Sequence, residues 1–267
     1  MAVVPRDAAT VIFIRNVVRS KAGLEVLMVQ RSSKSDFAPC VYTFPGGAVE
    51  PADCTALAEE NCLGLTLQQA QSIIRDVTHS DRALGFFVAA IREAFEEVGI
   101  LLAYRRNHDL MTFDGMEKAR FAEYRRQIQE RSFFFEKMIR KEELKLATDR
   151  LFYFAHWITP EVSPLRFDTR FFIAAAPSDQ KPLHDKIEIT ASRWISPREA
   201  LEKHKQSEFP LLPPTIFNLI SLTKFSSVDE VVASIDGKEI LTFIPEVIVE
   251  NGQIKIRLPW ERLLKDA

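Results

Sequence analysis

The 267-residue sequence has few cysteines and glycines, and several common functional signatures are missing from it. Its nine glycines form neither a P-loop nor a Rossmann pattern, and no HExxH or nucleophile-elbow motif is present. The three cysteines, Cys40, Cys54 and Cys62, form no CxxC pair. Because their number is odd and no export signal accompanies them, we expect reduced thiols.

Long apolar runs and a strong net charge are also absent. No stretch reaches the ~18 apolar residues of a membrane-spanning helix, and the net charge of −2 gives no general attraction for nucleic acid or anionic lipid. Residues 1–7 lack the features of a signal peptide, and residues 265–267 do not form a Ser-Lys-Leu peroxisomal address. We therefore expect a cytoplasmic location, with neither a nucleic-acid partner nor a membrane partner.

The most informative stretch is Arg92–Ile100, which places Glu93, Glu96 and Glu97 within five residues. At helical spacing these carboxylates share one face, and bare like charges there repel by roughly 0.2–0.5 kcal/mol per pair. Gly99 is placed to end the helix. The opposite face carries the apolar stripe of a core-packed helix: Phe87, Ile91, Ala94, Phe95 and Val98. Alone, this pattern also fits a solvated acidic surface helix, but a divalent cation is the stronger candidate to offset the charge.

The upstream segment Phe44-Pro45-Gly46-Gly47 favours the metal-binding interpretation. Together with Arg92–Ile100 it resembles the Nudix hydrolase motif of Gly, five residues, Glu, seven residues, and Arg-Glu-apolar-x-Glu-Glu-x-Gly-apolar. Three features depart from that motif: Asp53 replaces its first Glu, Ala94 is small for an apolar position, and 38 residues (54–91) replace the usual seven. An insertion here is typical of the peroxisomal-type coenzyme A diphosphatase branch and its bacterial relatives. Residues 26–32, Phe37-Ala38-Pro39 and 166–172 also resemble that branch.

This resemblance implies a Mg²⁺- or Mn²⁺-dependent hydrolase, and clustered carboxylates suit such hard cations. Glu96 and Glu97 are the main expected ligands, with Glu93 as a ligand or a base and the Gly46 carbonyl as a further donor. We expect Arg92 to orient these glutamates through charge-assisted hydrogen bonds. The family's general base varies, so Glu188 is a rival to Glu93. Asp53 is too short for direct ligation and is expected in an outer role.

The expected partner is a small nucleotide containing a diphosphate, and the resemblance implies coenzyme A or an acyl-coenzyme A. ADP-ribose or NADH, and a module that binds nucleotide without cleaving it, are the alternatives. Oligomeric state is left open, a homodimer included. Candidate contacts to the substrate are Gly47, Arg31, Arg166 and Arg170. The two strand arginines, Arg166 and Arg170, also fit a solvent-facing stripe, and we interpret His156 and His184 as structural.

The predicted fold is α/β (α+β): a Nudix α/β/α sandwich with a mixed sheet, forming one domain over residues 1–267. Strands are expected at 8–14, 25–30, 101–104, 151–158, 166–174 and 189–195. Helical insertions are expected at about 54–86 and 105–147, and a short helix with a β-hairpin at about 225–260. The first insertion is either a cover over the site or a passive excursion, and the aromatic residues of the second are expected in the core.

Overall fold

A computed structural model describes residues 3–17, 23–35, 38–55, 59–183, 188–250 and 253–257, without the side chains of 248–250 and 253–257. It confirms the predicted mixed α/β fold, which is built on an eight-stranded sheet in the order β10-β2-β1-β9-β8-β11. The short strands β3 and β4 pair with β2 and β1. The strand bounds are β1 Arg6–Asn16, β2 Leu24–Arg31, β3 Tyr42–Thr43, β4 Gly46–Ala48, β8 Phe152–Ile158, β9 Phe167–Ala175, β10 Ile189–Ile195 and β11 Thr242–Phe243.

The central strand β1 shows how the sheet separates two cores. It pairs with β9 in parallel and with β2 and β4 antiparallel. Successive side chains of a strand point to opposite faces. Accordingly, Val11 and Phe13 pack into one buried cluster, whereas Ile12 and Ile14 pack into another. A strand buried on both faces reads as a continuous apolar run, and residues 11–14 form such a run.

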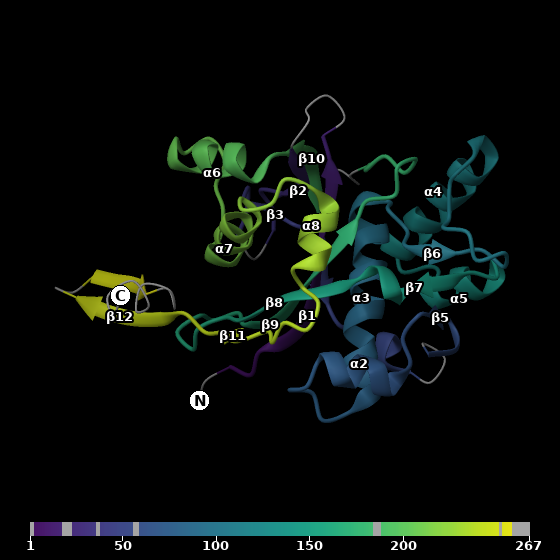
Figure 1. Ribbon diagram of the computed structural model, residues 1–267, viewed down its shortest axis with the longest axis horizontal. Coiled ribbons are helices and arrows are strands. Elements are labelled where there is room, and N and C mark those ends of the chain that lie inside the picture. Colours follow the sequence, from purple (N-terminus) through teal and green to yellow (C-terminus); the bar gives the residue numbers. More distant parts are fainter. Residues whose placement is uncertain are drawn as a thin grey trace.

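Helices cover both faces of the sheet (Figure 1). The long helix α3 (Ser80–Val98) lies on the same side as α2 (Leu67–Ile73), and α6 (Pro197–Lys205), α7 (Pro213–Leu222) and α8 (Val228–Ala233) lie on the other. Side-chain caps explain several of these starts: Thr66, Ser196 and Ser227 each accept a hydrogen bond from a backbone N–H of the first turn.

Helix α3 carries the acidic motif and packs as its apolar stripe predicts. All five residues of that stripe are buried. The helix ends at Gly99, whose φ of 69° is left-handed and favours glycine. It begins at Ser80, so residues 80–86 belong to this helix and not to the predicted insertion.

The two predicted insertions are not separate helical excursions. A three-stranded sheet joins them: β5 (Cys62–Leu63) of the first pairs in parallel with β7 (Lys145–Ala147) of the second, and β7 pairs with β6 (Ala103–Tyr104). The strand expected over 101–104 is therefore short and lies in this small sheet. The predicted second insertion holds two helices, α4 (Gly115–Gln129) and α5 (Phe135–Lys141). Insertions far apart in sequence thus form one structural unit, at the right of Figure 1.

The C-terminal part forms the expected short helix and hairpin. Strands β12 (Glu246–Glu250) and β13 (Gln253–Arg257) pair antiparallel, away from the main sheet in Figure 1. Their connecting turn at Asn251-Gly252, together with Phe37 and His184, lies outside the described residues. Among the described helices, none combines the length and hydropathy that crossing a bilayer requires.

Candidate active site

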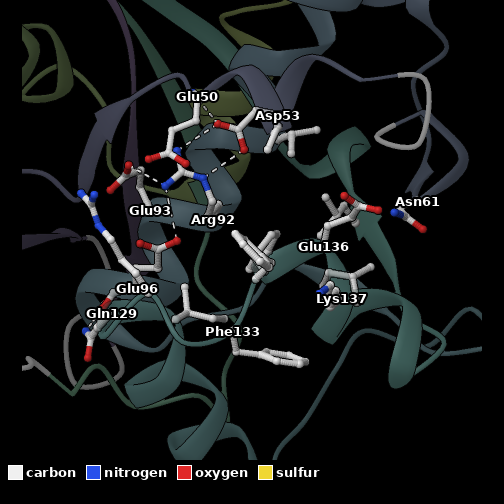
Figure 2. Close-up of a pocket in the computed structure, with 18 of the residues that line it drawn as sticks. Glu50, Asp53, Asn61, Arg92, Glu93, Glu96, Gln129, Phe133, Glu136 and Lys137 are labelled. Atoms are coloured by element: carbon white, nitrogen blue, oxygen red, sulfur yellow. Dashed lines mark hydrogen bonds and ion pairs between the residues drawn. The ribbon is translucent and has the colours of Figure 1, made fainter.

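The acidic face of α3 opens into a cavity of about 670 Å³. A volume of this size suits a small-molecule ligand. In Figure 2, Arg92, Glu93 and Glu96 lie on one side of it, and Phe133, Glu136 and Lys137 lie across from them. The cavity therefore has an acidic side from the predicted motif and a second side from the α4–α5 unit.

Arg92 is the organising cation of the acidic side. Its guanidinium donates to both carboxylate oxygens of Asp53, from Nε to Oδ1 at 3.0 Å and from Nη2 to Oδ2 at 2.9 Å. It also donates to the Ala48 carbonyl at 2.8 Å, to Glu93 at 2.8 Å and to Glu96 at 3.4 Å. Burial alone would lower the pKa of Arg92, but Glu93 and Asp53 hold it above its ordinary value. The predicted orienting role of Arg92 thus has a geometric basis.

Both carboxylate oxygens of Asp53 are engaged by protein groups. Besides binding Arg92, its Oδ2 accepts from the Glu50 backbone N–H at 2.8 Å, which caps the 3₁₀ turn η1 (Pro51–Cys54). Its side chain is 3% exposed. The outer role expected of Asp53 stays a prediction.

Two glycines bring backbone against the glutamates. The Gly46 N–H donates to Glu97 Oε2 at 2.9 Å. A Cβ added at Gly47 would lie 2.6 Å from the Glu93 carboxylate carbon, so no larger residue fits without moving Glu93. Strand β4 and the acidic face of α3 are therefore in direct contact, as the joined motif predicts.

The glutamates occupy an environment that disfavours their charges. Burial raises the pKa of Glu93 to about 7, against the lowering effect of Arg92. Burial also raises the pKa of Glu96, and burial together with Glu93 raises the pKa of Glu97 well above its ordinary value. A cation placed among these carboxylates would favour their ionised forms.

We compared this donor set with the needs of a divalent cation. Over the described part of the chain, no three His, Cys, Asp or Glu side chains converge as a ready metal site. The donor chemistry nevertheless fits Mg²⁺ or Mn²⁺, because Glu93, Glu96 and Glu97 are oxygen donors on one wall of a cavity. Arg92 pairs with Glu93 and Glu96, whereas Glu97 accepts from the Gly46 N–H.

Two further predicted residues lie near this face. Glu188 is exposed and lines the same cavity, and its charge raises the pKa of Glu97. The Arg31 charge acts on Glu97 in the opposite direction. The backbone at the end of β2 links the two segments, since the Ser32 N–H donates to the Glu188 carbonyl at 2.8 Å. The structure thus brings Glu188 and Arg31 to the acidic side.

The strand arginines predicted to bind substrate lie elsewhere. Arg166 is buried and donates to the carbonyls of Thr159 and Val3, at 2.9 and 2.7 Å. Arg170 is also buried and forms ion pairs with Asp76 and Asp168. Neither arginine lines the cavity described above. Alternation along the strand puts the partly exposed Asp168 and the buried Arg170 on one face, and a contact of Arg170 with substrate stays a prediction.

His156 belongs to the same buried network. Its Nε2 lies 2.5 Å from Asp168 Oδ1, and its Nδ1 lies 2.8 Å from the Thr242 hydroxyl. With the side chain buried between these partners, His156 links β8, β9 and β11. This geometry agrees with the structural role expected for it.

The sequence did not reveal the second side of the cavity. Its lining includes Phe133, Phe134, Lys137, Ile139 and Arg140 from the α4–α5 unit. The aromatic residues of this segment were expected in the core, and Phe135 is indeed buried, but Phe134 is 62% exposed. The signal available in the sequence for this side of the cavity was the run of three phenylalanines, 133–135, beside a turn. Glu50 was also missed, although it adjoins the matched motif and lines the cavity.

The α4–α5 unit is tied directly to the motif helix. Arg125 Nε and Gln129 Nε2 both donate to the Glu96 carbonyl, at 2.8 and 2.5 Å. Carbonyls in the last turn of a helix lack intrahelical partners, so these bonds supply donors to an acceptor that the helix leaves unpaired. Arg125 also donates from Nη1 to the Leu183 carbonyl at 2.5 Å. These bonds therefore fix the position of the α4–α5 unit relative to the helix that carries the glutamates.

Comparisons with known proteins agree with this geometry. The profile of the NUDT19 Nudix domain matches residues 5–222. The chain is 28% identical over 242 residues to a Xenopus laevis protein named acyl-coenzyme A diphosphatase NUDT19, covering 80% of this chain and 64% of the relative. A Gallus gallus protein of the same name is 31% identical over 239 residues, covering 77% and 63%. The chain thus spans somewhat less than two thirds of the length of these curated relatives.

A solved structure supports the fold. The crystal structure of a Nudix hydrolase from Alicyclobacillus acidocaldarius aligns with a TM-score of 0.70 and 25% sequence identity. The alignment covers 88% of this chain and 99% of the other. Most of this chain therefore shares its fold with that Nudix hydrolase.

Proposed function

Since the chain belongs to the NUDT19 Nudix domain family, we propose that it hydrolyses the diphosphate of coenzyme A or an acyl-coenzyme A. The products would be 3′,5′-ADP and phosphopantetheine or its acylated form. One observation carries the proposal: Glu93, Glu96 and Glu97 line one ligand-sized cavity, and Arg92 pairs with Glu93 and Glu96. The name of the relatives, acyl-coenzyme A diphosphatase, supports the choice of substrate.

Glu93, Glu96 and Glu97 would hold the divalent cation, with the Gly46 carbonyl as a further donor. When bound, Mg²⁺ or Mn²⁺ would neutralise part of the negative charge of the diphosphate and lower the pKa of the attacking water. Arg92 holds the side chains of Glu93 and Glu96 in place, and Asp53 in turn fixes Arg92. Residues that are held by such partners reorganise little during reaction.

The chain offers two carboxylates to accept the proton of the attacking water. Glu188 enters the cavity from the loop before β10, and Glu93 lies against Gly47. The attack forms a bond from the water oxygen to one phosphorus and breaks the bridging P–O bond, and the leaving oxygen carries away the electron pair. Arg31, whose charge reaches Glu97, is placed to attract the phosphate oxygens.

A product assay tests this proposal. Purified full-length protein would be incubated with Mg²⁺ or Mn²⁺ and, separately, with coenzyme A, an acyl-coenzyme A, ADP-ribose or NADH. We expect 3′,5′-ADP from the coenzyme A compounds and loss of turnover in EDTA. If AMP forms from ADP-ribose or NADH and the coenzyme A compounds give no product, the substrate assignment is wrong. If none of these compounds gives a product, the proposed activity is refuted.

Matched variants test the site itself. Glu96→Gln and Glu97→Gln should each lower kcat/KM by about 10²-fold or more, because each removes a proposed ligand charge. Glu123→Gln is the control, since Glu123 is an exposed glutamate of α4 that pairs with Arg126 outside the cavity. Full activity in Glu96→Gln and Glu97→Gln would remove the metal-site argument.

A further inference from the structure

We propose that the α4–α5 unit forms a subsite for the apolar acyl arm of the substrate, with Phe134 as its principal contact. This inference rests on the proposed function and extends it to residues outside the Nudix motif. It assigns chain-length preference to the second side of the cavity, while the acidic side handles the diphosphate.

The cavity is chemically divided. Its acidic side carries Glu93, Glu96 and Glu97, whereas the other side combines aromatic and aliphatic side chains with the charged residues Arg131, Glu136, Lys137 and Arg140. The apolar lining comprises Val88, Ile128, Phe133, Phe134, Ile139 and Leu146. A ligand that joins an anionic group, which a cation can bridge, to an apolar group matches the glutamates on one side and the apolar lining on the other. An acyl-coenzyme A has that composition.

Phe134 is poorly explained by folding alone. Its side chain is 62% exposed although it borders a cavity, so it contributes little to the buried core. It also occupies the N-cap of α5, where it provides no side-chain hydrogen bond. Asn, Asp, Ser and Thr are preferred at that position. An aromatic residue that is both exposed and unfavourable as a cap is better explained by contact with a ligand.

The structure around Phe134 holds the aromatic wall in place. Arg131 adopts a left-handed φ of 56°, and the N–H groups of Ser132 and Phe133 both donate to the Gln127 carbonyl, at 2.9 and 3.2 Å. Phe133 stacks on Tyr124 with ring centroids 5.6 Å apart. The turn between α4 and α5 is thus fixed, and its aromatic side chains form a firm surface.

An acyl chain fits this wall better than adenine does. A saturated chain needs only apolar surface, and the lining supplies it. Adenine would also need partners for the polar atoms at its edge. Two of the cations on this side are engaged locally: Lys137 Nζ lies 5.0 Å from the Phe134 ring centroid, and Arg140 pairs with Glu136 at 3.5 Å. Their aliphatic stems extend the apolar surface.

The test compares the length dependence of turnover in two variants. kcat and KM would be measured with Mg²⁺ for coenzyme A and for its acetyl, octanoyl and palmitoyl thioesters. The variants are Phe134→Asn and a control, Met116→Asn, on the same unit. Met116 is 85% exposed and does not line the cavity. Thermal unfolding of each protein would accompany the kinetics.

We expect Phe134→Asn to lower the ratio of kcat/KM for palmitoyl-coenzyme A to that for coenzyme A by about tenfold, mainly through KM. Its Tm should stay equal or rise, because Asn is a favoured N-cap. Met116→Asn should leave the ratio unchanged. These results together would support the subsite.

Two results would overturn the inference while leaving the proposed function intact. One is an unchanged palmitoyl-to-free ratio in Phe134→Asn. The other is an equal loss for coenzyme A and every thioester, which would place the adenosine or pantetheine portion against Phe134. Absence of 3′,5′-ADP from the unmodified protein with every substrate would instead refute the proposed function, and the subsite with it.

Discussion

The pair formed by Arg92 and Asp53 should be the most strongly coupled interaction of the acidic side. Their side chains are 8% and 3% exposed, and two hydrogen bonds of 3.0 and 2.9 Å join them. Breaking a buried ion pair from one side typically costs about 3–5 kcal/mol, because the remaining charge loses its partner. Arg92→Met removes the cation shared by Asp53, Glu93 and Glu96, so we expect a loss of stability in that range.

Asp53→Asn should cost less, about 1.5–3 kcal/mol. The amide oxygen can still accept from Arg92, whereas the charge and one acceptor are lost. In the double variant, neither a buried cation nor a buried carboxylate is left without its partner. The total loss should therefore fall below the sum of the single losses by about 1.5–3 kcal/mol, which is a typical coupling for residues in one buried network.

Urea unfolding followed by circular dichroism would measure all four proteins of this cycle. The buffer should contain EDTA, so that cation binding does not add to stability. Equal m-values would show that the same surface unfolds in each. Additive single losses, within about 0.5 kcal/mol, would refute the claim that Asp53 fixes Arg92. If Asp53→Asn lowers the free energy of unfolding as much as Arg92→Met does, the larger contribution to stability assigned to Arg92 is wrong.

Three other perturbations have defined outcomes. Gly47→Ala should lower kcat/KM at least about tenfold, since its Cβ would displace Glu93, while Tm falls only slightly; unchanged kinetics would contradict the close approach. Thr148→Val should cost about 1–3 kcal/mol in urea unfolding, because the buried hydroxyl bonds to both Leu63 and Leu65 across the insertions. Burial would raise the pKa of Asp168, but His156 and Arg170 lower it. This carboxylate should therefore stabilise the fold above its unfolded pKa of about 3.9 and lose that effect as pH falls through its lower folded pKa. The stability gap between wild type and Asp168→Asn should accordingly shrink below about pH 4, and a gap independent of pH would contradict this assignment.

Local signals in the sequence explain why much of the fold could be predicted. The apolar stripe of α3 and its Gly99 terminus, the caps at Thr66 and Ser196, and the β-branched run of β1 each act within a few residues. Their physical causes are short-range hydrogen bonds and side-chain periodicity. The contact of Gly46 and Gly47 with the glutamates was reached only by resemblance, because spacing alone does not bring β4 to α3.

The features that escaped prediction depend on contacts distant in sequence. Strand β5 is two residues long, and its partner β7 lies more than eighty residues later, so neither has a detectable pattern of its own. The same holds for Arg166 and Arg170. Arg166 directly precedes β9 and Arg170 lies within it, and their alternation was readable, but their protein partners, Asp76 and the carbonyls of Thr159 and Val3, were not.

The 38 residues between Asp53 and Arg92 interrupt the motif in sequence but not in space. These two residues, 39 positions apart, form the hydrogen-bonded pair that positions the glutamates. Closing a flexible loop of 38 residues rather than seven costs only about 1.5 kcal/mol more, since the entropy grows with the logarithm of length. The insertion offsets this cost by folding: Ile74 and Val77 are buried in the main core, and Asp76 pairs with Arg170. An interrupted motif can therefore keep the geometry of an intact one, while the inserted chain supplies strand β5, through which the wall opposite the glutamates is attached.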